Sequence, residues 1–136
     1  MTTQQLLAQS LEQVVERVGD PAPLVYQRLF ERSPELLAMF VGDTRGSVRA
    51  EMFLRAIDTL TDLAGERHFA AGMIASEWSN HSMNGVSTRQ FESFFEIIVE
   101  VCQQALGADW TPEIDAAWRS TLDRVIGVTA RVSAAA

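Results

Sequence analysis

The chain has 136 residues, 11 of them basic and 18 acidic, so its formal net charge is −7. This length predicts one domain over residues 1–136, and the negative charge argues against a nucleic-acid partner, because phosphates attract cationic surfaces. The single cysteine, Cys102, excludes an internal disulfide, and its apolar helical setting predicts a packing role. The sequence shows no signal segment and no apolar run of about 18 residues, so we expect a cytoplasmic protein with no membrane partner.

The apolar residues recur with a helical period almost throughout, and no alternating strand pattern competes. In chain order, we expect a first helix that ends near Gly19 and Asp20 and a second helix whose first turn holds Pro21 and Pro23. A short helical piece follows over residues 33–40. Four longer helices are then expected, over about 47–64, 66–80 and 91–106 and from Pro112 onward. Residues 41–47 have loop composition. Ser87 and Gln90 form a capping box, and Thr111 is placed to cap the last helix. The predicted fold class is all-α.

The sequence contains few motifs that point to a particular chemistry. The chain has no glycine-rich phosphate loop and no H-E-x-x-H, C-x-x-C or G-x-S-x-G pattern, so hydrolytic and nucleotide-binding functions lose their usual support. Only two histidines occur, His68 and His81. His81 closes a predicted helix five residues before Val86, where a ring nitrogen could hold an iron from one side. The alternative is a surface or core histidine without a ligand role.

Several segments, taken in order, carry a family resemblance: Leu24-Val25-Tyr26-Gln27-Arg28-Leu29-Phe30, Ser33-Pro34-Glu35-Leu36, Met39-Phe40, His81-x-x-x-Gly85-Val86 and Ala116-Ala117-Trp118. Together they resemble a globin, and most closely the single-domain bacterial globins and the haem domain of flavohaemoglobins. No one motif is specific, but the ordered set spans nearly the whole chain. The resemblance implies a globin fold with helices packed around a pocket for haem b and its iron.

By this resemblance, His81 takes the place of the proximal iron ligand, and Val86 follows it as a cofactor contact. Phe40 matches the phenylalanine that packs on the haem, and Pro34 matches the proline that turns the chain toward it. Tyr26 matches a position over the iron, where its hydroxyl would favour bound dioxygen; the alternative is a tyrosine with its hydroxyl at the surface. His68 falls in a connection that faces solvent in globins.

On the distal side, counting back from His81 in the globin frame places Arg49 at the position that usually holds histidine or glutamine. Its guanidinium could donate to a bound ligand or hold a haem propionate, and the sequence leaves both roles open. Phe53, one turn later, is expected to form the apolar wall. Arg45, in the loop, is a second candidate for a propionate.

On the proximal side, the chain departs from the flavohaemoglobin pattern. Phe91 stands where those proteins have a tyrosine that supports the proximal histidine, so that support should be weaker, although Glu113 matches their glutamate. Phe91 is still expected to contact the cofactor. Glu77 lies one turn before His81, where the family prefers an apolar residue. Its carboxylate could face outward or could affect the imidazole.

The function implied by the resemblance is reversible binding of dioxygen, nitric oxide or carbon monoxide. It would serve oxygen transport or storage, or nitric oxide oxidation with a separate reductase, and whether the protein is an enzyme stays open. The alternative is a sensor or regulatory globin, poor in haem, that acts through a partner protein. Both a monomer and a homodimer are compatible with the sequence.

Overall fold

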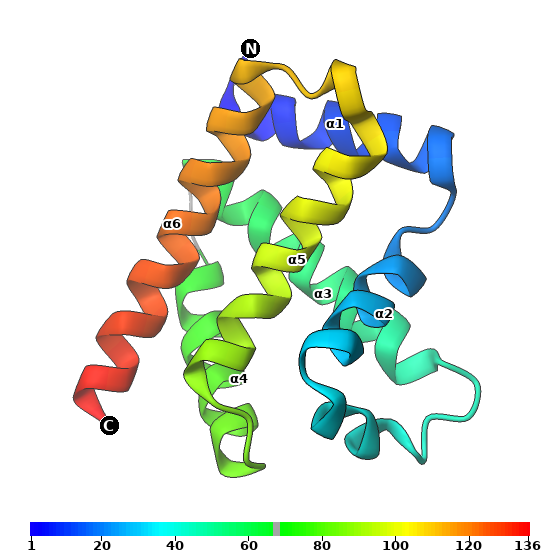
Figure 1. Ribbon diagram of the computed structural model, residues 1–136. Coiled ribbons are helices and arrows are strands. Elements are labelled where there is room, and N and C mark those ends of the chain that lie inside the picture. Colours follow the sequence, from blue (N-terminus) through cyan, green and yellow to red (C-terminus); the bar gives the residue numbers. More distant parts are fainter. Residues whose placement is uncertain (67–68) are drawn as a thin grey trace.

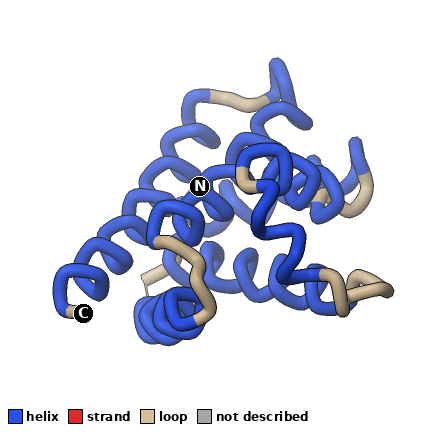
Figure 2. The backbone as a smooth tube through the Cα atoms, turned by 60° about the horizontal axis from the view of Figure 1, so that its bottom comes forward, coloured by secondary structure: helices blue, strands red, loops and turns tan. Residues whose placement is uncertain are grey.

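The computed structural model describes residues 1–66 and 69–136, and in these ranges it contains helices and connecting turns but no strand. The helices are α1 (Thr3–Val18), α2 (Ala22–Arg32), η1 (Pro34–Phe40), α3 (Ser47–Ala64), α4 (Ala70–Met83), α5 (Thr88–Leu106), η2 (Gly107–Asp109) and α6 (Pro112–Ala135), where η marks a 3-10 helix. Figure 2 shows short connections between most of them. The predicted all-α class is confirmed.

Most helix ends follow from local chemistry. The Ser87 hydroxyl accepts the backbone N–H of Gln90 while the Gln90 side chain accepts that of Ser87, which confirms the predicted capping box of α5. The Thr111 hydroxyl accepts the backbone N–H of Ile114 at the start of α6. Gly19 ends α1 with a backbone φ of 73°, a conformation that residues other than glycine rarely adopt.

The structure differs from the prediction in several details, and α5 begins at Thr88 rather than at residue 91. Pro21 precedes α2 rather than lying in its first turn, although Pro23 is in that turn. The segment over 34–40 is a 3-10 helix, and α4 covers Ala70–Met83 instead of 66–80. The prediction for His68 lies outside the described residues.

The helices surround one continuous core, and α5 lies near its centre. This helix packs against α1, α2, α4 and α6, while α3 packs against α1, α2, α4 and α6 (Figure 1). Ile97 and Ile98 of α5 and Trp118 of α6 are fully buried. Burying a side chain of this size stabilises a fold by roughly 1.5–3 kcal/mol.

One buried polar contact fixes how α1 meets α6. The indole Nε1 of Trp118 donates to the Ser10 hydroxyl at 2.9 Å, and both residues are fully buried. The Ser10 hydroxyl in turn donates to the carbonyl of Leu7. This chain of hydrogen bonds satisfies the polar atoms that the two helices bring into the core. Within the described residues, no helix is long and apolar enough to span a membrane.

Candidate functional site

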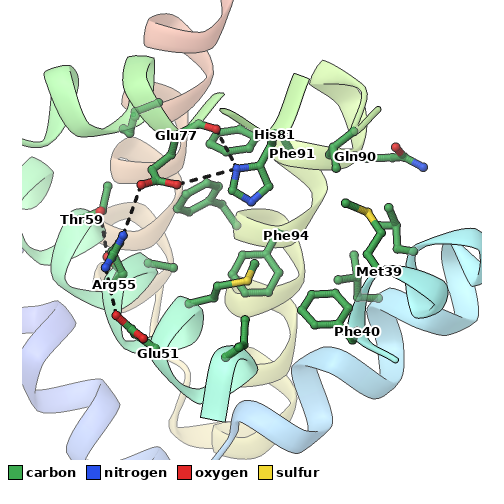
Figure 3. A pocket seen from close by; sticks show the side chains of 18 of the residues that line it. Met39, Phe40, Glu51, Arg55, Thr59, Glu77, His81, Gln90, Phe91 and Phe94 are labelled. Carbon is green, nitrogen blue, oxygen red and sulfur yellow. Dashed lines mark hydrogen bonds and ion pairs between the residues drawn. The ribbon is translucent and has the colours of Figure 1, made fainter. Parts of the chain in front are cut away.

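A cavity of about 400 Å³ opens between η1, α3, α4 and α5 (Figure 3). This volume lies in the range of small-molecule sites, roughly 300–1,000 Å³. Most of the lining side chains are apolar: Leu29, Leu36, Met39, Phe40, Val48, Met52, Ala56, Met73, Ile74, Val86, Phe91, Phe94 and Phe95. The polar ones are Glu51, Arg55, Thr59, Glu77, His81 and Gln90.

His81 lies in the last turn of α4 and presents one ring nitrogen to this cavity. Its Nδ1 is 2.7 Å from the backbone carbonyl oxygen of Glu77, and the other nitrogen, Nε2, points into the pocket (Figure 3). A carbonyl can only accept a hydrogen bond, so this contact favours the tautomer with the proton on Nδ1. The lone pair of Nε2 is then available to a ligand. The side chain is 28% exposed.

The turn after His81 brings Val86 to the same cavity. The carbonyl of His81 accepts the backbone N–H of Val86 at 2.9 Å, and Gly85 adopts φ of 88° between them. This left-handed glycine closes the helix and reverses the chain, as in common helix C-terminal motifs. Phe91, at the start of α5, packs its ring at an edge-on angle against His81, with 5.3 Å between the centroids. His81, Val86 and Phe91, all predicted as site residues, are thus brought together.

Phe40 also lines the cavity, and Tyr26 lies behind it. The Tyr26 ring packs against Phe40 and Phe94, with centroid distances of 5.8 and 5.5 Å, and only 4% of the residue is exposed. Its hydroxyl donates to the backbone carbonyl of Arg49 at 2.7 Å. Burial raises the pKa of this hydroxyl well above its ordinary value, so it stays protonated. The hydroxyl of Tyr26 is therefore engaged with α3, and the residue is not among the described ones that line the cavity.

The wall formed by α3 differs from the prediction by one residue. Val48 and Met52 line the cavity, whereas Arg49 and Phe53 are not among the described lining residues. Phe53 is buried elsewhere in the core. Because successive helical residues are about 100° apart, a shift of one position moves a side chain to a different face. Arg45 is exposed in the loop before α3 and is likewise not among the lining residues.

Asp43 explains the direction that Arg49 takes. Its carboxylate accepts the backbone N–H groups of Val48 and Arg49 at 3.1 and 3.0 Å, and also Nε of Arg49 at 3.1 Å. Desolvation acts to raise the pKa of Asp43, but these hydrogen bonds outweigh it and hold the pKa below its usual value. The guanidinium of Arg49 is thereby turned toward the loop.

Arg55 is a lining residue that the sequence interpretation missed. Its guanidinium contacts Glu77 of α4 at 3.3 Å and Glu51 of α3 at 3.1 Å. The signal was present in the spacing, because Arg55 follows Met52 by three residues and so shares its face of α3. The globin resemblance instead assigned the cavity face of α3 to Arg49 and Phe53.

The prediction that Glu113 supports His81 is wrong. Glu113 is exposed in the first turn of α6, at the end of the molecule near α1, whereas His81 lies in the last turn of α4 at the opposite end (Figure 1). A carboxylate in the first turn of a helix is favoured by the unpaired N–H groups there. This helix-end role accounts for Glu113.

An all-helical fold that presents one imidazole nitrogen to a largely apolar cavity is typical of haem-binding proteins. The globin family model matches residues 24–129, and the chain belongs to the globin family. None of the curated proteins compared with the chain matches it. Globins are haem proteins that bind diatomic gases.

The residues of the cavity fit a haem group. The available Nε2 of His81 is the kind of donor that haem iron takes in globins, and the aromatic and aliphatic walls suit the apolar faces of a porphyrin. Arg55 is the cationic side chain among the described lining residues, and it lies beside two carboxylates rather than free in the pocket.

Proposed function

We propose that this protein is a haem b globin that reversibly binds dioxygen or another diatomic gas, and that the His81 imidazole would hold the iron. The observation that carries the proposal is the Nε2 of His81 directed into an apolar cavity while Nδ1 is held by the carbonyl of Glu77 (Figure 3). Bound haem supplies an iron with a coordination position for the gas. The proposal treats the whole chain as one domain, and Tyr26, Pro34 and Phe40 support a likeness to single-domain bacterial globins.

The chain's own residues would bind the cofactor and limit the access of water. Phe40, Val48, Met52 and Phe94 contribute apolar surface to the cavity and no side-chain hydrogen-bond donor. Such a wall keeps water away from a reactive centre and holds the cofactor by burial of its apolar faces. These side chains suit gas binding, for which no proton has to be delivered.

Gas binding is favoured over catalytic oxidation of nitric oxide because of Phe91. Its ring packs at a T-shaped angle against His81 and can neither donate nor accept a hydrogen bond, so it does not increase the basicity of the imidazole. Nitric oxide and carbon monoxide remain ligands within this proposal, and oxidation with a separate reductase is its enzymatic extension.

A second candidate is a sensor or regulatory globin that holds little haem and acts through a partner. It is favoured by one observation: Arg55 contacts both Glu51 and Glu77 at the cavity, so three charged groups lie where an apolar cofactor would bind. Burying such charges against a porphyrin is costly unless they stay paired and hydrated.

Haem titration separates the two candidates. Purified protein without haem, titrated with haemin, should develop a Soret band that saturates at one haem per chain and shifts after addition of dithionite and carbon monoxide. Ala56→Trp should weaken binding, because Ala56 lines the cavity and an indole would fill it. Ala116→Trp, at an exposed position of α6, is the control. Absence of a saturable band in the folded wild-type protein would contradict haem binding and favour the regulatory candidate.

A further inference from the structure

Two groups of Glu77, its backbone carbonyl and its side-chain carboxylate, lie close to the imidazole of His81. Its backbone carbonyl accepts the Nδ1 proton at 2.7 Å, which is the ordinary contact between residues four apart on a helix. Its side-chain Oε2 lies 3.8 Å from the same nitrogen. This distance is too long for a hydrogen bond but places a negative charge next to the N–H group. Glu77 is therefore more than a backbone acceptor.

The other oxygen of Glu77 is held from the opposite wall. Oε1 of Glu77 is 3.3 Å from the guanidinium of Arg55, and a second nitrogen of Arg55 reaches Glu51 at 3.1 Å (Figure 3). The contacts thus run from α3 to α4 and end at His81. Because Arg55 engages Oε1, the carboxylate is oriented with Oε2 toward the imidazole. The Glu77 side chain is 32% exposed, which leaves its charge only partly screened by water.

Phe91, which also contacts the imidazole ring, cannot provide this effect. The Phe91 ring packs against His81 at a T-shaped angle and carries no hydrogen-bonding group. Among the contacts given by the described residues, the charge nearest His81 is therefore that of Glu77. A carboxylate beside Nδ1–H polarises this bond and makes Nε2 a stronger electron donor.

We propose that Glu77 is a positioning residue that increases the donor strength of His81 toward a bound iron, and that Arg55 holds its carboxylate for this purpose. The inference rests on the proposed function, because it needs haem bound through His81. Glu77 would then increase the electron-donor strength of His81, an effect that neither Phe91 nor Glu113 provides.

Resonance Raman spectroscopy of the ferrous, haem-loaded protein tests this inference, because the iron–histidine stretching band reports donor strength directly. Glu77→Gln removes the charge and retains the backbone carbonyl, so the band should move to lower frequency and the reduction potential at neutral pH should rise. Glu77→Leu gives a second variant with the same expected shifts if glutamine impairs folding. A purely structural role for Glu77 would alter stability and leave both readouts in place.

Glu51→Gln is the matched control. It makes the same change of charge on a residue that also contacts Arg55 but lies one contact further from His81, and its side chain is 72% exposed. Band and potential should stay near the wild-type values. If Glu77→Gln and Glu77→Leu shift them no more than Glu51→Gln does, the inference is overturned while haem binding stands. If the wild-type protein shows no histidine-ligated haem, it is the proposed function that fails.

Discussion

Replacing Tyr26 by phenylalanine distinguishes between two positions for its hydroxyl. In the structure the hydroxyl donates to the carbonyl of Arg49 at 2.7 Å, and the ring packs against Phe40 and Phe94. The resemblance to bacterial globins predicts instead that the hydroxyl lies over the iron. Tyr26→Phe keeps the ring and removes only the hydroxyl, so packing should be retained.

The magnitude follows from the partner that is lost. The carbonyl of Arg49 lies in the first turn of α3 and keeps its helical hydrogen bond, so the variant loses the net value of one hydrogen bond, about 0.5–1.5 kcal/mol. With an unfolding entropy of about 2.1 cal/mol/K per residue, the Tm of a chain of this length should fall by about 2–5 °C.

Thermal unfolding and stopped-flow oxygen release, measured on the same haem-loaded samples, provide the assay. We expect lower stability of Tyr26→Phe and an oxygen release rate close to that of the wild type. The opposite pattern would refute the reasoning: unchanged stability with release about five- to thirtyfold faster, the effect of losing about 1–2 kcal/mol of hydrogen bonding to bound dioxygen. Tyr26 would then act as the distal donor.

Three further predictions concern the rest of the fold. Ser10→Ala should lower the free energy of unfolding by about 1–3 kcal/mol in urea titrations, because it leaves the buried indole N–H of Trp118 unpaired; an effect below that range would contradict the geometry. Since its folded pKa is depressed, Asp43 should contribute stability that is complete above the ordinary aspartate pKa of 3.8 and is lost as the pH falls through the lower folded value. Asp43→Asn should therefore reduce the loss of folding stability at acid pH. An unchanged loss of stability would show that the Asp43 carboxylate does not contribute to it. Burial raises the pKa of the Cys102 thiol to about 12, so at about pH 8 iodoacetamide should modify it only as fast as the chain opens. Rapid labelling of the folded protein would contradict this and show that the thiol is accessible.

The fold was largely predictable because its signals are local. The period of apolar residues, the capping pair Ser87 and Gln90, and the prolines at helix starts depend on neighbours within one turn. The predicted helix over 47–64 coincides with α3. The start of α4 was less predictable, because its N-cap residue, Phe69, makes no side-chain cap hydrogen bond.

The site was predictable where a residue is fixed by the chain next to it. His81 and Val86 are joined by the turn at Gly85, and both line the cavity. The direction of α3 side chains depends instead on Asp43, whose carboxylate binds the start of that helix and turns Arg49 away. The contact joins the loop to the helix that follows it, and the spacing of apolar residues alone does not encode it.

The pairing of Arg55 with Glu77 shows the same limit. The two residues are far apart in sequence, and their contact exists only because α3 packs against α4. Sequence alone left open whether Glu77 faces outward or toward the imidazole. Packing of the two helices brings its carboxylate toward His81.

The central claim is that His81 binds the iron, and imidazole rescue tests it most directly. His81→Gly, loaded with haemin, should lose the wild-type Soret spectrum and regain it when free imidazole is added, because the small ligand can occupy the place of the side chain. His68→Ala is the control, as it replaces the other histidine of the chain. The account predicts loss and rescue for His81→Gly and a wild-type spectrum for His68→Ala. A wild-type spectrum for His81→Gly without added imidazole would contradict it.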